Sequence, residues 1–315
     1  MKDLKIASAQ FEHRSGDKKY NLSVIEKLSG KASGEGAEII AFHECSVTGY
    51  TFARHLTKEQ MLALAELIPE GESISKLVDI AEKNNIIILA GIFEKDKNDN
   101  LYNSYVCVDK NGLIAKARKL HPFINPNLQP GDYYCIFEIK GWKCSILICY
   151  DNNIIENVRA VTLLGAQIIF MPHVTMCTPS PRPGAGLVNP ELWKNREKDP
   201  TSLRIEFDGL KGRQWLMKWL PARAYDNGVY VVFSNPVGMD DDQVRNGCSM
   251  IIDPFGDILA ECRSFDDSYV TALITPEKLA LAGGYRYIMA RKPELYRDII
   301  GQIHKPEQKV IWLND

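Results

Sequence analysis

The sequence predicts an α/β protein in which helices cover the faces of sheets. Short runs of apolar and β-branched residues recur along the chain, and each run is bounded by Gly, Pro, Asn or Asp, as buried strands are. Between several of these runs the apolar residues follow helical spacing instead. The alternation of the two patterns is typical of α/β folds.

The predicted elements follow one another from the N-terminus to about residue 274. The predicted strands are residues 4–10, 38–42, 86–92, 104–108, 142–148, 167–171, 229–234, 249–252 and 269–274. Helices are predicted at residues 18–31, 73–84, 152–164 and 211–227. Turn residues such as Asp, Asn, Pro and Gly connect neighbouring strands at residues 109–112 and 253–256.

Two stretches depart from this alternation. Residues 177–212 combine a Pro- and Gly-rich segment with a charged one, and such long connections are usually lids, binding loops or locally disordered. Residues 284–315 have mixed polarity and no clear period. We therefore expect one domain over residues 1–283, with 177–212 as a candidate lid. Residues 284–315 form a C-terminal tail that could dock on the domain or be exchanged between subunits.

Composition excludes several classes of protein. The net charge is −2 and both signs are mixed along the chain, unlike the basic surface of a nucleic-acid-binding protein. No apolar run is long enough to cross a bilayer, and the N-terminus lacks the apolar core of a signal peptide. The eight cysteines show no C-x-x-C spacing, which suits a reducing compartment. We expect a cytoplasmic protein with no nucleic-acid or membrane partner.

Three reactive residues each follow a predicted strand. Glu44, Lys119 and Cys149 come directly after strand-like runs that end at residues 43, 118 and 148. Because ligands of α/β sheets bind beyond the carboxyl ends of strands, we expect these side chains to converge. Cys149 also precedes a turn and a predicted helix. The field at a helix N-terminus would favour the thiolate form of this residue.

These residue types suit nucleophilic attack on a carbonyl carbon. A thiol needs a base that takes its proton and an acid that returns one to the leaving nitrogen, and Glu44 can serve as both. Lys119 supplies a cation for the negatively charged intermediate, and the backbone amide of Tyr150 could donate a further hydrogen bond. Position alone also allows plainer interpretations, in which Cys149 is core packing and the other two side chains are solvated strand ends.

Six segments, in the same order, resemble the nitrilase superfamily of carbon-nitrogen hydrolases. In the first three segments, Glu44, Lys119 and Cys149 occupy the positions of the catalytic residues. No single segment is decisive, but six in order make a specific match over most of the chain. The segments are residues 42–50, 116–121, 147–156, 164–172, 221–236 and 247–256.

The resemblance implies a four-layer αββα sandwich of two mixed sheets. It also implies a Glu–Lys–Cys triad in one pocket, a covalent thioester intermediate resolved by water, and no metal or organic cofactor. Members of this family form dimers that pair sandwiches through helices, so a homodimer or a higher homo-oligomer is expected.

The sequence also departs from the family pattern. His43 stands where proline is commoner, and residues 153–155 replace the Arg, aromatic and Pro that often follow the nucleophile motif. Many relatives carry a second glutamate where residues 122–129 contain no acid at all. Asn125 or Asn127 could position substrate or water there instead. Other candidate substrate contacts are Tyr50, His173 and Trp193.

The resemblance leads to a function and to alternatives. The Cys-Tyr-Asp sequence at residues 149–151 resembles amidases and carbamoylases more than nitrilases. We therefore expect hydrolysis of a small linear amide or N-carbamoyl amine, with release of ammonia. The alternatives are a nitrilase that acts on a nitrile and a non-catalytic interaction protein of the same fold. The missing acid supports the second alternative, and the intact set of three catalytic residue types opposes it.

Overall fold

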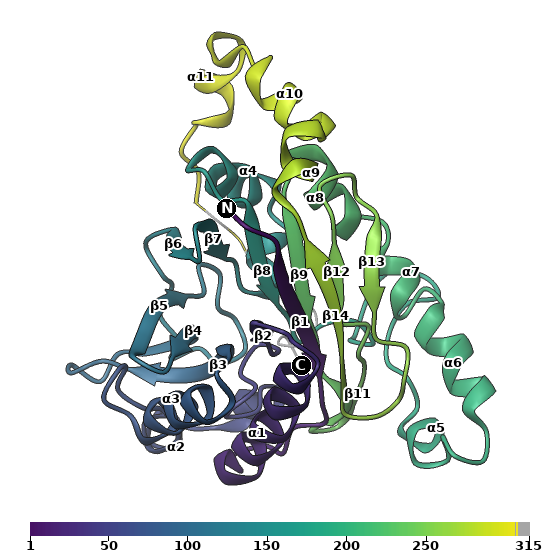
Figure 1. Ribbon diagram of the computed structural model, residues 1–315. Helices are drawn as coiled ribbons and strands as arrows, with labels where there is room; N and C mark the ends of the chain where they lie inside the picture. The colour runs from purple at the N-terminus through teal and green to yellow at the C-terminus, as the bar shows by residue number, and fades with distance from the viewer. Residues whose placement is uncertain (306, 308–315) are drawn as a thin grey trace.

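The computed structural model describes residues 1–305 and residue 307, and two six-stranded mixed sheets form its centre (Figure 1). In the first sheet the order is β14-β1-β2-β3-β4-β5, and β1, β2 and β3 are parallel. Its strands are β1 (Leu4–Gln10), β2 (Ile39–Ala41), β3 (Ile87–Lys95), β4 (Leu101–Asp109), β5 (Gly112–Arg118) and β14 (Ser268–Ile274).

The second sheet has the order β13-β12-β9-β8-β7-β6, with β7, β8 and β9 parallel. A separate hairpin pairs β10 (Val237–Asp240) with β11 (Gln243–Asn246). The strands of the second sheet are β6 (Cys135–Ile139), β7 (Trp142–Ile146), β8 (Ile168–Pro172), β9 (Tyr230–Ser234), β12 (Met250–Ile252) and β13 (Ile258–Glu261).

Alternating side chains divide the core into three layers of apolar contact. On β2, Ile39 and Ala41 face the second sheet, whereas Ile40 faces outward, as the two-residue period of a strand requires. The outward face of the first sheet packs against α1 (Lys18–Gly34) and α3 (Glu72–Asn84). The outward face of the second packs against α4 (Ile155–Leu163) and α8 (Leu220–Asn227). The fold is therefore the expected four-layer αββα sandwich.

Several helices differ from the sequence-based expectation. The helix expected over residues 211–227 is two helices, α7 (Arg213–Leu216) and α8, and Pro221 lies in the first turn of α8, where its missing N–H is tolerated. Residues 177–212 hold α5 (Pro190–Lys194) and α6 (Pro200–Asp208). Both begin with an Asn or Asp cap followed by proline, a helix-start signal that composition alone had obscured.

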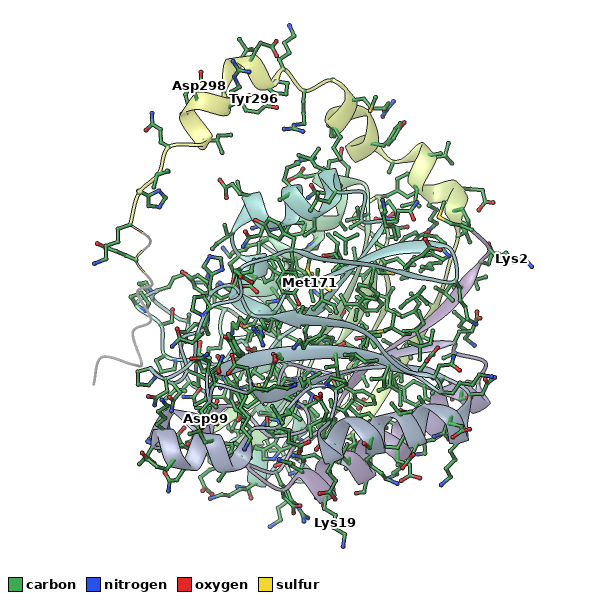
Figure 2. All side chains as sticks on the ribbon, turned by 90° about the vertical axis from the view of Figure 1, so that its left-hand side faces the viewer. Lys2, Lys19, Asp99, Met171, Tyr296 and Asp298 are labelled. Atoms are coloured by element: carbon green, nitrogen blue, oxygen red, sulfur yellow. The ribbon has the colours of Figure 1, made fainter. Side chains whose placement is uncertain are left out.

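Short helices also occupy the C-terminal region, where the sequence showed no period. They are α9 (Pro276–Leu281), α10 (Gly283–Met289), η3 (Pro293–Leu295) and α11 (Arg297–Ile300). From α10 onward they form an arm, residues 283–305, which projects beyond the sandwich and carries Tyr296 and Asp298 far from the core (Figures 1 and 2). Residues 306 and 308–315 of the expected tail lie outside the described residues.

Three further short elements complete the chain. They are η1 (Thr51–His55), α2 (Lys58–Leu64) and η2 (Cys149–Asn152). No helix in the described part of the chain combines the length and apolar character needed to span a membrane.

The turn that follows β2 lies directly on β3, and this contact requires a glycine. The Gly91 amide donates to the Ser46 hydroxyl (3.1 Å), and the Gly91 carbonyl accepts from the Val47 amide (2.9 Å). A β-carbon on Gly91 would lie 2.1 Å from the Cys45 backbone nitrogen, which is closer than any such contact allows. Glycine at this position therefore sets how closely the segment containing Glu44 approaches the sheet.

Replacing this glycine tests the contact. We expect Gly91→Ala to lower the free energy of unfolding by at least about 1–3 kcal/mol, because the added methyl group overpacks a rigid backbone. Denaturant unfolding measures the change. Gly34→Ala in α1 is the matched control, since no atom lies within 4 Å of its added carbon. A Gly-to-Ala change within a helix raises the free energy of unfolding by up to about 1 kcal/mol. Equal stability of the two variants would contradict the prediction.

Candidate active site

Cys149 lies at a sharp turn between the second sheet and a helix. β7 ends at Ile146, and Cys149 begins the single 3₁₀ turn of η2 with a φ of 51°, a left-handed conformation that non-glycine residues rarely adopt. Its side chain is buried, with a residue exposure of 6%, and its sulfur lies 3.9 Å from the Val174 carbonyl oxygen. The turn therefore directs the thiol into the space between the two sheets.

The environment of Cys149 favours the thiol over the thiolate. Burial, followed by the negative charge of Glu44, raises the pKa of Cys149 to about 12, and Lys119 opposes this only in part. The expectation that a helix N-terminus would favour the thiolate was therefore wrong. The physical reason is that α4 begins only at Ile155, while a carboxylate lies beside the sulfur.

Glu44 is held from three directions. Its Oε1 atom accepts hydrogen bonds from Lys119 Nζ (2.6 Å) and Asn103 Nδ2 (2.6 Å). Its Oε2 atom accepts from the Val174 amide (3.2 Å). The Val174 backbone therefore contacts Glu44 through its amide and faces the Cys149 sulfur through its carbonyl oxygen. These contacts bring the carboxylate, the ammonium group and the thiol together in one buried cluster.

Lys119 is a buried cation whose charge is stabilised by its surroundings. It follows β5, and its amide donates to the Asn103 carbonyl oxygen (2.8 Å). Burial opposes its charge, but Glu44 and then Tyr50 raise the pKa of Lys119 well above the usual value. Its Nζ atom lies 3.5 Å from the Tyr50 hydroxyl and 4.7 Å from the centre of the Phe123 ring. Lys119 therefore carries a full positive charge at neutral pH.

Asp151 joins the segment after Lys119 to the turn that contains Cys149. Its carboxylate accepts hydrogen bonds from the amides of Leu120 (3.1 Å), His121 (3.0 Å) and Ile148 (3.2 Å). The His121 ring nitrogen Nδ1 lies 2.9 Å from the same carboxylate. Asp151 therefore fixes the ends of β5 and β7 relative to each other. Sequence reasoning missed this role and that of Asn103, although the position of Asp151 two residues after the expected nucleophile was a usable signal.

The other candidate residues lie at different distances from this cluster. His173 is buried between Phe233 and Trp219, contacts Asn152 Nδ2 (3.2 Å), and has its pKa lowered by burial and then by Lys119. The Tyr50 hydroxyl faces Lys119. The ring of Tyr150 packs against Phe123. Tyr50 and His173 thus border the cluster, and Tyr150 lies beside it because it directly follows Cys149 in the turn.

Asn125, Asn127 and Trp193 make structural contacts instead. Asn125 donates to the carbonyl oxygens of Ala53 (2.8 Å) and Leu56 (2.9 Å) and accepts from Asn127. Trp193 packs in an aromatic cluster with Phe207 and Phe265 on the outer side of the second sheet. The side chain of segment 122–129 that reaches Lys119 is the aromatic ring of Phe123. In the described residues no group of three His, Cys, Asp or Glu side chains could hold a metal ion.

Comparison with known proteins agrees with this geometry. The carbon-nitrogen hydrolase family matches residues 5–283. The chain is 31% identical to a nitrilase from Pyrococcus abyssi over 260 residues (82% of this chain, 84% of the relative). It is 32% identical to a 2-oxoglutaramate amidase from Bacillus subtilis over 263 residues (81% and 85%).

A solved structure supports the fold independently. A nitrilase-superfamily amidase from Nesterenkonia AN1 superposes with a TM-score of 0.68 at 22% identity, over 94% of this chain and 96% of that one. Three observations point to the same family: the sandwich fold, the buried cluster of Glu44, Lys119 and Cys149, and the family match over residues 5–283. The chain therefore belongs to the carbon-nitrogen hydrolases of the nitrilase superfamily.

Proposed function

We propose that this hydrolase cleaves a small linear amide or N-carbamoyl amine through a thioester on Cys149. The observation that carries the proposal is the buried contact of the Glu44 carboxylate with Lys119 (2.6 Å) beside the Cys149 sulfur. Because the pKa of Cys149 is about 12, the resting nucleophile is a thiol, and its proton must leave during attack. Glu44 is the base within reach.

The reaction then runs through two acyl transfers. The Cys149 sulfur bonds to the carbonyl carbon while its proton passes to Glu44, and Lys119 stabilises the negative oxygen with help from the Tyr150 amide. Glu44 returns the proton to the leaving nitrogen as the carbon–nitrogen bond breaks, which leaves a thioester and releases ammonia. Water next attacks the thioester, Glu44 takes its proton, and the acid leaves with the thiol restored.

The names of several relatives support an amide substrate. Besides the Bacillus subtilis amidase, they include an (R)-stereoselective amidase from Pseudomonas sp and an N-carbamoylputrescine amidase from Solanum lycopersicum. The tight enclosure of Cys149 supports a small substrate, because a bulky acyl group has little room near the sulfur. The Pyrococcus abyssi nitrilase keeps a nitrile as the second candidate substrate.

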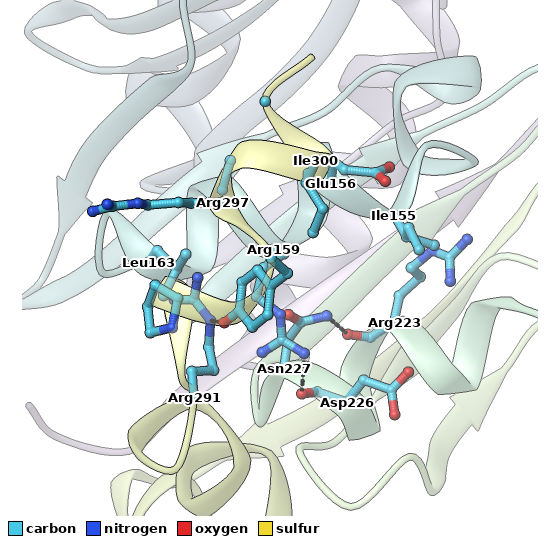
Figure 3. Close-up of a pocket in the computed structure, with 14 residues that line it drawn as sticks. Ile155, Glu156, Arg159, Leu163, Arg223, Asp226, Asn227, Arg291, Arg297 and Ile300 are labelled. Carbon is cyan, nitrogen blue, oxygen red and sulfur yellow. Dashed lines mark hydrogen bonds between the residues drawn. The ribbon is translucent and has the colours of Figure 1, made fainter.

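We further propose that the enzyme is a homodimer or higher homo-oligomer that uses the face of α4, α8 and the arm. Arm side chains such as Met289, Leu295 and Ile299 are 68–69% exposed although they are apolar. Between the arm and the two helices lies a groove of about 620 Å³, lined by Ile155 and Leu163 among other residues (Figure 3). An arm that projects from its own domain can bury these apolar side chains against a second copy related by two-fold symmetry.

The substrate proposal is tested by measuring ammonia release from panels of amides, N-carbamoyl amines and nitriles. We expect activity on the first or second panel, and at least about 10³-fold less with Cys149→Ala because the covalent route is lost. Cys144→Ala is the control, since Cys144 is another buried cysteine from the same strand region and packs only in the core. Activity on nitriles alone would overturn the proposed substrate class.

If Glu44 is the base, replacing it should stop amide turnover and at the same time make Cys149 easier to deprotonate. We expect Glu44→Gln to abolish amide turnover, because no base remains to accept the thiol proton. The same change should lower the pKa of Cys149, because Glu44 raises it and Lys119 still lowers it. The pH dependence of iodoacetamide labelling at Cys149, followed by peptide mass spectrometry, reports this pKa. An unchanged labelling profile would show that Glu44 does not act on the sulfur.

The oligomer proposal predicts that charge on the shared face separates the subunits. We expect the double substitution Ile155→Glu and Leu163→Glu to yield monomers in sedimentation velocity, because both side chains line the groove and are about half exposed. Ile205→Glu on α6 is the control, since Ile205 is equally apolar and 67% exposed but lies outside this face. A monomeric wild-type protein would contradict the proposal.

A further inference from the structure

The hairpin β10–β11 carries a buried ion pair that the reaction does not use. Asp240 Oδ2 lies 3.0 Å from Arg245 Nε, and both side chains are almost fully buried. Burial opposes ionisation of Asp240, but Arg245 and then His13 hold the pKa of its carboxyl well below the usual range. A buried pair of this kind adds little net stability because both charges lose their hydration. Its presence points to a role other than filling the core.

The pair binds the segment that runs from Glu44 to Tyr50 at its C-terminal end. Asp240 accepts hydrogen bonds from both the amide (3.0 Å) and the hydroxyl of Thr51, the residue after Tyr50. Arg245 Nη2 donates to the same hydroxyl (2.8 Å). Thr51 is fully buried, so these contacts are not exchanged with solvent. The position of Tyr50, whose hydroxyl faces Lys119, follows from them.

The N-terminal end of the same segment is bound through two histidines. The second oxygen of Asp240, Oδ1, lies 3.0 Å from His13 Nε2, and His13 Nδ1 lies 3.0 Å from His43 Nε2. Burial lowers the pKa of His43 well below the usual value, so its ring is neutral at neutral pH. His43 stands directly before Glu44. A hydrogen-bonded ring therefore fixes the backbone directly before the carboxylate.

Arg245 also reaches a second segment of the active site. Its Nη1 atom donates to the Met176 carbonyl oxygen (3.1 Å). Met176 lies two residues after Val174, whose amide binds Glu44 and whose carbonyl oxygen faces the Cys149 sulfur. The ion pair thus holds two segments of the active site: residues 43–51, which carry Glu44 and Tyr50, and residues 174–176, which begin with Val174.

We propose that Asp240 and Arg245 are positioning residues that hold Glu44, Tyr50 and Val174 in place around Cys149. The proposal rests on the function proposed for this cysteine. The pair touches none of the reacting groups and acts through Thr51, the two histidines and Met176. Small displacements of a base or an oxyanion donor cost far more in rate than in binding. Disrupting the pair should therefore lower kcat and leave KM nearly unchanged.

The test compares isosteric substitutions on the network. In Asp240→Asn, one amide N–H must face a donor of Arg245, Thr51 or His13, whichever way the side chain turns. We expect kcat to fall about 10²-fold with KM within about threefold of wild type. Thr51→Val, which loses only the bridging hydroxyl, should lower kcat in the same way. Thr51→Ser, which keeps the hydroxyl, should restore it.

A second readout does not depend on the substrate. If Glu44 is displaced, the labelling profile of Cys149 with iodoacetamide should move in the same direction as in Glu44→Gln. This measurement stays informative if no amide proves to be a substrate, which separates failure of the network proposal from failure of the proposed function. If Asp240→Asn does not fold, the two Thr51 variants decide the question.

Asp253→Asn is the matched control. Asp253 is equally buried, pairs with Lys278 and caps the turn between β12 and β13, away from both active-site segments. We expect this variant to lose thermal stability while kcat and the Cys149 labelling profile stay at wild-type values. The proposal is overturned if folded Asp240→Asn or Thr51→Val keeps wild-type kcat and labelling and loses only stability, as the control does.

Discussion

The buried contact between the Glu44 carboxylate and the Lys119 ammonium group constrains everything around it. Two charges are tolerated inside a protein only when each is paired and hydrogen bonded, because burial removes their hydration. Glu44 meets this condition through Asn103 and Val174 in addition to Lys119. Strands from both sheets end where they can supply these partners. The surroundings of the site are therefore organised by the pair itself, before any substrate binds.

The same pair explains why the Cys149 side chain is a neutral thiol. A thiolate beside Glu44 would place two negative charges in a buried space with a single nearby ammonium group, and the pKa of Cys149 is raised accordingly. In the proposed reaction, proton transfer is therefore coupled to bond formation rather than completed beforehand. This arrangement differs from cysteine sites that store a thiolate, and it protects the sulfur from unselective alkylation and oxidation.

Sequence reasoning reached the parts of the structure that depend on local pattern. The α/β class, most of the strands and the three strand-end residues follow from periodicity and from residues within short windows, whereas the αββα arrangement was implied by the resemblance to a known family. Asn103 and Asp240 were not predictable, because their partners lie far away in the chain and become neighbours only in the folded protein. The thiolate expectation for Cys149 failed for the same reason, since burial and a nearby carboxylate outweigh a helix end. The helices α5 and α6 are a different case. Their Asn or Asp caps and following prolines are local signals, but the irregular composition of residues 177–212 drew attention away from them.

The reactive groups come from different halves of the sandwich. Glu44 and Lys119 extend from strands of the first sheet, whereas Cys149 and Val174 extend from the second. In the proposed reaction neither half alone supplies a complete centre, so a partly folded chain with only one sheet formed would be inactive. The rate at which activity returns during refolding would then report the docking of the two halves. Because β13 and β14 are the last strands of the two sheets, the nascent chain would gain the proposed reactivity only after both have been synthesised.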